Sequence, residues 1–166
     1  MNTKDLKTAT GVLLTDQYQL TMAQLYFKMG IHDMTAQFDH FFRSTPDYGV
    51  HKAGYCINAG LDSFLDWLDE ADFGQGEIDY LRSHQSSNGK QLFEDDFLDW
   101  LKNQFSTKAI DLFAIPEGRV IHPNVPLHVV EGPLAICQII ETSLLNIINY
   151  QILIATKAAR IKQSSR

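Results

Sequence analysis

The sequence predicts one α+β domain followed by a long apolar helix, and three observations lead to this class. Up to Asn103, apolar residues mostly follow helical spacing. From Ala109 the pattern changes to short apolar runs separated by glycine and proline, which is typical of strands. From Pro133 a nearly continuous apolar stretch predicts helix again. With 166 residues and an ordinary 45% hydrophobic fraction, the chain has enough apolar side chains for one core.

The first part of the chain alternates helical and extended segments. A Thr-Asp pair opens the first helix and Gly30 stops it. The next segment is rich in aromatic and β-branched residues and ends before Pro46, which suits a strand with Arg43 at its end. In order, the expected elements are a helix over 15–29, a strand over 35–43, a strand or turn over 54–60 and short amphipathic helices over 61–68, 76–84 and 94–103.

The second part is expected to hold a small antiparallel strand cluster and then the apolar helical region. The strand runs are 110–115, 119–121 and 127–130, with turns at Pro116-Glu-Gly118, Pro123-Asn124 and Glu131-Gly132. Pro133 is acceptable in the first turn of a helix. We therefore divide the chain into an α+β domain over residues 1–132 and an apolar helical segment over residues 133–166.

The apolar helical segment is hydrophobic around most of its circumference, which predicts burial. A membrane span is the competing interpretation. Gln138, Glu141 and Asn146 interrupt the run, however, and a carboxylate in the middle of a lipid-facing helix is costly. We therefore expect a buried helix and no membrane partner.

Charge and cysteine usage narrow the class of protein. A net charge of −6 with no basic cluster argues against nucleic-acid binding, which needs a basic surface. Cys56 and Cys137 lie far apart in apolar surroundings and predict buried reduced thiols. The first fourteen residues contain no signal-peptide core, so we expect a cytoplasmic protein.

The common catalytic motifs for phosphate, zinc and serine chemistry are absent from the sequence. The six histidines lack zinc-ligand spacing, and we interpret His122 and His128 as strand-face residues on one hairpin, with a metal pair as the weaker alternative. Four polar groupings remain: Asp16 with Tyr18, Arg43, Glu117-Gly118, and Thr156 with Lys157 and Arg160. Each also has an ordinary structural interpretation, such as a helix-end charge or a core aromatic residue.

The chain as a whole resembles the amino-terminal part of nicotinate phosphoribosyltransferase. Six segments in order carry the resemblance: Leu13-Leu-Thr-Asp-Gln-Tyr-Gln-Leu-Thr-Met-Ala-Gln24, Phe38-Asp-His-Phe-Phe-Arg43, Gly54-Tyr-Cys-Ile-Asn-Ala-Gly-Leu61, Ile115-Pro-Glu-Gly118, Val130-Glu-Gly-Pro-Leu134, and Glu141-Thr-Ser-Leu-Leu-Asn-Ile-Ile-Asn-Tyr-Gln151 with Ile154-Ala-Thr-Lys-Ala-Ala-Arg160.

This resemblance implies an enzyme of NAD salvage that joins nicotinate to the ribose of phosphoribosyl pyrophosphate and releases pyrophosphate, with ATP hydrolysis coupled to the reaction. It also implies Mg²⁺, an α+β domain packed on an irregular α/β barrel, and a homodimer in which each active site receives residues from the partner's amino-terminal domain.

Carried over by position, the resemblance suggests six substrate-binding residues. Tyr18 would stack on the pyridine ring of nicotinate, with Asp16 beside it. Arg43 would bind phosphate oxygens, because a guanidinium can do so in bidentate fashion. Lys157 and Arg160 lie one helical turn apart and would meet a phosphate or the substrate carboxylate. Thr156 would contribute a hydroxyl, or else make a helix–helix contact.

The chain departs from the family in one respect. The phosphorylated histidine, the acidic residues near the ribose and the glycine-rich phosphate loop are expected on the barrel, and no residue here matches them. We therefore expect that this chain alone is inactive and that Ile147, Ile148, Ile152 and Ile154 form an exposed stripe where a further domain would pack. The family implies Mg²⁺ and ATP, and no residue of this portion is assigned to either. The alternatives are a related nicotinamide or quinolinate enzyme, or a non-catalytic dimerisation module.

Overall fold

The computed structural model describes residues 10–47, 49 and 54–165, and it confirms the α+β class. In chain order the helices are α2 (Gln17–Lys28), α3 (Leu61–Glu70), α4 (Gln75–Arg82), α5 (Asp95–Gln104) and α6 (Leu134–Ser164), with one 3₁₀ turn, η1, at Thr107–Ala109. The strands are β1 (Thr35–His40), β2 (Cys56–Ile57), β3 (Asp111–Ala114), β4 (Val120–Ile121) and β5 (His128–Pro133).

The strands form two antiparallel sheets, ordered β1-β5-β3 and β2-β4. In the larger sheet Thr35 pairs with Pro133, and His40 pairs with His128. In the smaller sheet Cys56 pairs with Ile121. The predicted cluster of three late strands is therefore only partly right, because β4 pairs with β2 and the central strand β5 pairs with the early strand β1. The two histidines expected on one hairpin are also separated: His122 directly follows β4 of the smaller sheet, whereas His128 begins β5 of the larger sheet.

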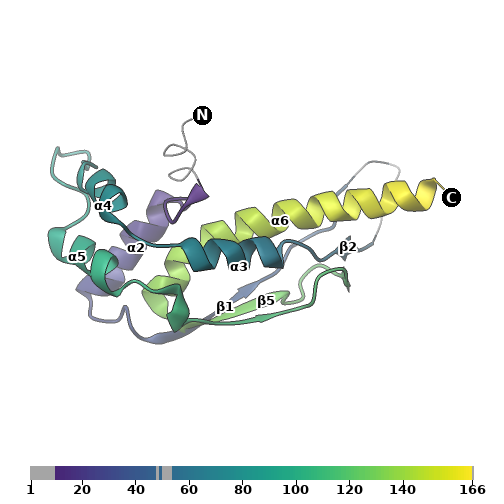
Figure 1. Ribbon diagram of the computed structural model, residues 1–166, viewed down its shortest axis with the longest axis horizontal. Coiled ribbons are helices and arrows are strands. Elements are labelled where there is room, and N and C mark those ends of the chain that lie inside the picture. Colours follow the sequence, from purple (N-terminus) through teal and green to yellow (C-terminus); the bar gives the residue numbers. More distant parts are fainter. Residues whose placement is uncertain (1–9, 48, 50–53, 166) are drawn as a thin grey trace.

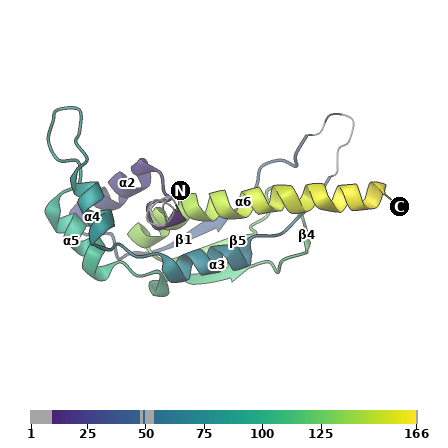
Figure 2. The same cartoon turned by 45° about the horizontal axis from the view of Figure 1, so that its top comes forward.

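Helix α6 runs along most of the length of the molecule, with α3 and the sheets beside it and α2, α4 and α5 gathered at one end (Figures 1 and 2). Pro133 closes β5 and is the N-cap of α6, so strand and helix join without a linker and the helix starts one residue later than expected. The division into residues 1–132 and 133–166 stays a prediction, although the first half of α6 lies in the same core as the sheet.

The two halves of α6 differ in burial. Its first half is mostly buried: every residue from Ala135 to Ile140 is buried, followed by Ser143, Leu144 and Ile148. After Ile148 only Ile152 and Thr156 are buried, and the helix projects beyond the other elements (Figure 1). By length and composition α6 is also apolar enough to cross a membrane, but a core helix passes the same test, and this one packs against α2, β1, β2, β5 and α3.

The predicted exposed stripe on α6 is partly wrong. Ile148 and Ile152 are buried, at 0% and 5% exposure, because they lie one turn apart on the face that β2 and α3 cover. Ile154 is exposed as expected. The exposed apolar side chains of this half are Tyr150, Leu153, Ile154 and Ile161.

Gly60 shows how closely the loop before α3 approaches α6. Its φ of +106° is a left-handed conformation that favours glycine. A Cβ at this position would lie 3.1 Å from the Cα of Ile148. The close approach places β2 and the start of α3 directly on the middle of α6.

Candidate functional site

The start of α2 is held on α6 by polar side chains. The amide nitrogen of Asp16 donates to Thr142 Oγ1 at 3.3 Å, and the Thr142 hydroxyl lies 3.3 Å from Asp16 Oδ2. Asp16 occupies the N-cap position but makes no hydrogen bond from its side chain to the helix backbone. Its carboxylate is therefore fixed against α6 rather than used as a cap.

A buried amide connects Tyr18 to this contact. Gln19 is fully buried, and its Nε2 donates to the hydroxyl oxygen of Tyr18 at 2.8 Å and to Glu141 Oε2 at 3.0 Å. Gln138 Nε2 donates to the Gln19 side-chain oxygen and to Glu141 Oε2. We call the side chains of Asp16, Tyr18, Gln19, Gln138, Glu141 and Thr142 the α2–α6 polar cluster.

Tyr18 is anchored at its hydroxyl, although about half of the residue is exposed. The side chain is 51% exposed. The pKa of the Tyr18 hydroxyl is raised by partial desolvation and by the negative charges of Glu141 and Asp16. Tyr18 is thus a neutral, oriented aromatic surface with two carboxylates on its hydroxyl side.

Tyr18 also borders a shallow open groove of about 400 Å³. On one side of this groove are Gln17, Tyr18 and Thr21 of α2. On the other side are Gln85, Ser86, Ser87 and Leu92, which belong to the connection between α4 and α5.

A second groove, of about 320 Å³, lies between the end of β1 and α6. Its lining includes Arg43, Phe38 and His40 from the β1 side, together with Glu141 and Cys137 of α6. The Arg43 side chain is exposed. Because Glu141 belongs to this groove and also to the α2–α6 polar cluster, the structure brings Arg43 and Tyr18 to the same region of α6.

Two stacked histidines lie behind this second groove. His40 and His128 have ring centroids 5.1 Å apart, with their Nδ1 atoms at 2.9 Å, and His40 Nε2 lies 3.0 Å from Asn149 Oδ1. If His40 donates to Asn149, its Nδ1 accepts from His128 and leaves a lone pair on His128 Nε2. Among the described residues His128 Nε2 has no hydrogen-bond partner. Burial lowers the pKa of both rings, and that of His128 falls to about 4.

Thr156, Lys157 and Arg160 lie far from Tyr18. The Thr156 hydroxyl is buried, donates to the carbonyl of Ile152 and accepts from the amide of Ile57 at 2.9 Å. Thr156 therefore joins α6 to strand β2, and its contribution to substrate binding stays a prediction. Lys157 is exposed and Arg160 is half-buried. Lys157 is sixteen residues beyond Glu141 in the same helix, which corresponds to about 24 Å at 1.5 Å per residue.

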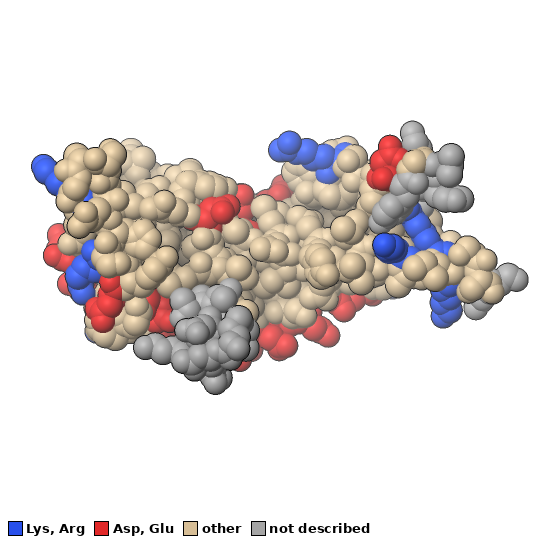
Figure 3. All heavy atoms as spheres, turned by 90° about the horizontal axis from the view of Figure 1, so that it is seen from above, with Lys and Arg blue, Asp and Glu red and all other residues tan. Residues whose placement is uncertain are grey.

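The basic end of α6 is a separate surface. Figure 3 shows several groups of Lys and Arg atoms at the end of the molecule that α6 forms, with one group of Asp or Glu atoms near them, whereas other Asp and Glu atoms lie along the middle. Arg160 also lies close enough to Cys56 for its charge to lower the pKa of that thiol, although burial raises the pKa more. Within one chain, the six predicted residues fall into two groups, Asp16, Tyr18 and Arg43 near Glu141, and Thr156, Lys157 and Arg160 near β2.

The Glu117-Gly118 grouping has a structural role. Glu117 Oε1 accepts hydrogen bonds from the amides of Gly60 at 2.5 Å and Leu61 at 2.6 Å, at the amino terminus of α3. The turn also fixes Asn58, whose side-chain Nδ2 donates to the carbonyl of Ile115. Helix termini offer unpaired amides that a carboxylate satisfies well.

The sequence interpretation missed Gln19, Gln138, Glu141 and Thr142 as site residues. Positions 138, 141 and 142 are three and four residues apart, so they share one face of a helix. In the sequence, Gln138 and Glu141 argue against a membrane span, and no local pattern marks them as site residues. The described residues contain no group of three or more His, Cys, Asp or Glu side chains that could hold a metal ion, so no Mg²⁺ ligand is assigned here.

Known proteins similar to this chain share this arrangement of elements. Residues 13–149 match the family model for the nicotinate phosphoribosyltransferase (NAPRTase) N-terminal domain. The nicotinate phosphoribosyltransferase of Caenorhabditis elegans is 41% identical over 92% of this chain, and that of Bacillus subtilis is 40% identical over 90%. The chain spans 26% and 28% of the length of these two relatives.

Solved structures agree with the sequence matches. The crystal structure of human nicotinic acid phosphoribosyltransferase superposes on 90% of this chain with a TM-score of 0.77 and 32% identity, and the chain covers 28% of it. A nicotinate-nucleotide pyrophosphorylase from Pyrococcus furiosus has the same fold over 89% of the chain, at a TM-score of 0.54 and 18% identity. The chain belongs to the nicotinate phosphoribosyltransferase family, and the part that it matches is the amino-terminal domain.

Proposed function

We propose that this chain is the amino-terminal portion of a cytoplasmic nicotinate phosphoribosyltransferase of NAD salvage. The reaction joins nicotinate to phosphoribosyl pyrophosphate, releases pyrophosphate and is coupled to ATP. The observation that carries the proposal is the exposed, hydroxyl-anchored ring of Tyr18 beside the Arg43 groove, in a chain that matches the family through residues 13–149.

Tyr18 supplies a stacking surface for the pyridine ring of nicotinate. Offset stacking of two flat π-systems contributes about 0.5–1.5 kcal/mol beyond the area that it buries. The hydrogen bond from Gln19 fixes the ring before the substrate arrives, so little conformational entropy is lost on binding. Asp16 helps to position the Tyr18 ring, because it holds the start of α2 on Thr142.

Arg43 supplies positive charge for the phosphate groups. As pyrophosphate leaves, negative charge grows on its oxygens while positive charge builds on the ribose carbon. A guanidinium can bind phosphate oxygens in bidentate fashion. Arg43 is exposed at the edge of an open groove, so a phosphate can reach it without displacing protein.

We propose that these residues form only one wall of the site and that the chain alone is inactive. Lys157 and Arg160 lie about 24 Å along α6 from Glu141, too far to meet the ligand that touches Tyr18. A homodimer in which one protomer supplies Tyr18 and its partner supplies Lys157 and Arg160 would bring the two groups together. We assign the groups that bind Mg²⁺ and ATP to the remainder of the enzyme.

A non-catalytic interaction module is the second candidate, and one observation favours it. Tyr150, Leu153, Ile154 and Ile161 leave apolar surface exposed on the projecting half of α6. A chain that used only this surface would not need Tyr18 or Arg43.

A chimeric enzyme separates the two candidates. Residues 13–149 of this chain replace the matching segment of the Bacillus subtilis relative, and turnover of nicotinate with phosphoribosyl pyrophosphate, Mg²⁺ and ATP is measured. We expect an active chimera, a loss of about tenfold or more in kcat/KM for Tyr18→Ala, and recovery in Tyr18→Phe. An active chimera that tolerates Tyr18→Ala and Arg43→Ala would support the interaction module instead. Turnover by the unmodified 166-residue chain would overturn the proposal that the chain alone is inactive.

A further inference from the structure

Strand β1 ends before the chain reaches Arg43. Its pairing with β5 stops at His40, which faces His128, so residues 41–43 lie beyond the last paired position of the larger sheet. We call residues 41–43 the β1 overhang. Arg43 nevertheless lines the groove between the end of β1 and α6, together with Phe41. Because the sheet does not hold the β1 overhang, the position of Arg43 depends on contacts from other parts of the chain.

The loop between β4 and β5 supplies these contacts. The amide of Leu127 donates to the carbonyl of His40 at 2.8 Å, and the amide of Asn124 donates to the carbonyl of Phe42 at 2.9 Å. The Phe42 side chain also packs against the core. The bond from Asn124 acts on the peptide group that joins Phe42 to Arg43. It therefore fixes the backbone directly before the residue that carries the guanidinium.

The turn that carries this amide is left-handed at Asn124. Its φ is +59°, and among the described residues it is the only one other than glycine with a positive φ. A left-handed backbone is easy for glycine, tolerated by asparagine and unfavourable for β-branched residues. Pro123 precedes Asn124, an order that is typical of a type II turn. Asn124 is exposed, so a substitution there changes the turn without opening the core.

The His40 ring attaches the same segment to α6. Its Nε2 lies 3.0 Å from Asn149 Oδ1, and its Nδ1 lies 2.9 Å from His128 Nδ1. The β1 overhang thus begins at a residue that contacts α6 and is held further along by the loop before β5. With its backbone fixed in this way, only the exposed side chain of Arg43 must be ordered when an anion binds, which lowers the entropic cost of binding.

We propose that Asn124 is a positioning residue for Arg43. Its left-handed turn presents the amide that holds Phe42, and this contact keeps Arg43 at the groove where it meets the phosphate groups of phosphoribosyl pyrophosphate. The inference rests on the proposed function and goes beyond it, because it concerns a residue that acts only through Arg43. The turn sets how well the pyrophosphate end of the substrate is held, and it does not affect the stacking of nicotinate on Tyr18.

The first test measures the turn in the 166-residue chain. Asn124→Val places a β-branched side chain at the left-handed position, whereas Asn124→Gly keeps that conformation accessible. Amide hydrogen exchange at position 124, corrected for residue type, should accelerate about tenfold in the valine variant and less than about twofold in the glycine variant. Inorganic pyrophosphate, added up to about 10 mM, should shift the NMR signals of Arg43 less in the valine variant. Equal exchange in the two variants would show that the left-handed turn does not hold Phe42.

The second test measures kinetics in the chimeric enzyme, which contains both Asn124 and Arg43. Asn124→Val should raise the KM for phosphoribosyl pyrophosphate about fivefold, with kcat and the KM for nicotinate changed less than about twofold. Asn124→Gly should restore the KM to within about twofold of the parent value. A general loss of stability would instead reduce the amount of active enzyme and lower the apparent kcat.

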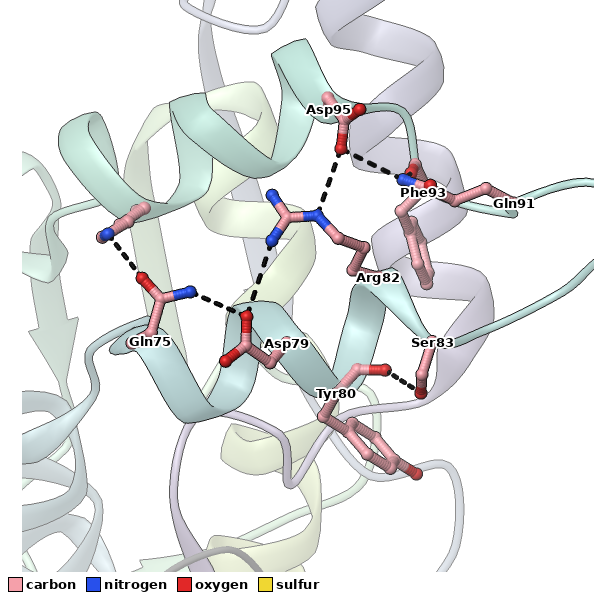
Figure 4. Close-up of polar contacts among 9 residues, drawn as sticks. Gln75, Asp79, Tyr80, Arg82, Ser83, Gln91, Phe93 and Asp95 are labelled. Atoms are coloured by element: carbon pink, nitrogen blue, oxygen red, sulfur yellow. Dashed lines mark hydrogen bonds and ion pairs between the residues drawn. The ribbon is translucent and has the colours of Figure 1, made fainter.

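Gly89→Val is the matched control, because it places the same side chain at another left-handed turn. Gly89 has a φ of +77°, and an added Cβ meets no atom within 4 Å. It lies in the connection between α4 and α5, at whose base Gln91 and Arg82 both contact Asp95 (Figure 4). None of the described residues that line the Arg43 groove belongs to this connection.

The outcomes separate the positioning role from the proposed function. An equal rise in the KM for phosphoribosyl pyrophosphate in Gly89→Val, or no rise in Asn124→Val, would overturn the positioning role of Asn124 and leave the proposed function standing. If Arg43→Ala leaves this KM unchanged in the chimera, the phosphate role of Arg43 is itself wrong.

Discussion

Both halves of α6 carry many apolar residues but have different surroundings. Residues up to Ile148 lie between α2 and the sheet, and this half carries Gln138, Glu141 and Thr142 of the α2–α6 polar cluster. Beyond Ile148 only Ile152 and Thr156 are buried, and the half ends in a basic surface. A helix that is apolar around most of its circumference needs other elements to cover it. In this domain the other elements cover α6 mainly along its first half.

The largest effect is expected in the core half. Ile139→Ala removes a fully buried side chain and should lower the free energy of unfolding by about 2–5 kcal/mol, since it leaves a cavity. Ile154→Ala makes the same chemical change at a 48% exposed position and should cost no more than about 0.5 kcal/mol. Urea unfolding measures both values. Equal losses at the two positions would contradict the division of α6 into a core half and a projecting half.

The histidine pair tests the junction between the halves, since Asn149 contacts His40 there. Burial lowers the folded-state pKa of His128 to about 4, and the positive charge of His40 acts in the same direction while Glu117 opposes it. The unfolded chain then binds more protons than the folded one between about pH 6.5 and 4, so stability is complete above this window and falls as pH decreases through it. At 1.36 kcal/mol for each pKa unit, the loss from His128 is on the order of 3 kcal/mol.

Unfolding measured between pH 7.5 and 4.5 checks this dependence, with His128→Gln as the comparison. The variant should be less stable at pH 7.5 but show a flatter pH dependence, because it lacks the titrating ring. If the free energy of unfolding of His128→Gln falls with decreasing pH as steeply as that of the parent chain, the histidine pair does not cause the pH dependence.

Thr156 tests how the projecting half is fastened. Thr156→Val removes the hydroxyl that accepts from the amide of Ile57, and the unsatisfied amide should cost about 1–3 kcal/mol. Thr156→Ser keeps the hydroxyl and is the control. Hydrogen exchange of the Ile57 amide should accelerate in the valine variant alone, and equal exchange in both variants would mean that the contact does not hold β2 on α6.

The sequence predicts local elements of this protein better than it predicts their partners. Helical spacing located α3, α4 and α5 within a few residues, because their buried side chains recur every three to four positions. The pairing of β4 with β2 connects positions more than sixty residues apart and leaves no local signal. For the site, Tyr18 and Arg43 are predicted from the family resemblance. The role of Gln19 is not predictable in this way, because the contacts of its buried side-chain amide depend on which face of α6 packs against α2.

The smallest effect on stability is expected at the exposed apolar residues of the projecting half. Tyr150→Ser and Ile161→Ser change side chains that are 63% and 59% exposed, so unfolding should shift by no more than about 0.5 kcal/mol. The same variants should reduce self-association and the binding of a dye that reports apolar surface, because contiguous exposed apolar residues favour contacts with other molecules. Gel filtration and dye fluorescence measure this, with Phe113→Ser as the control at a 61% exposed position on β3. If Phe113→Ser reduces dye fluorescence by the same amount, the dye reports apolar surface over the whole molecule and not specifically at the end of α6.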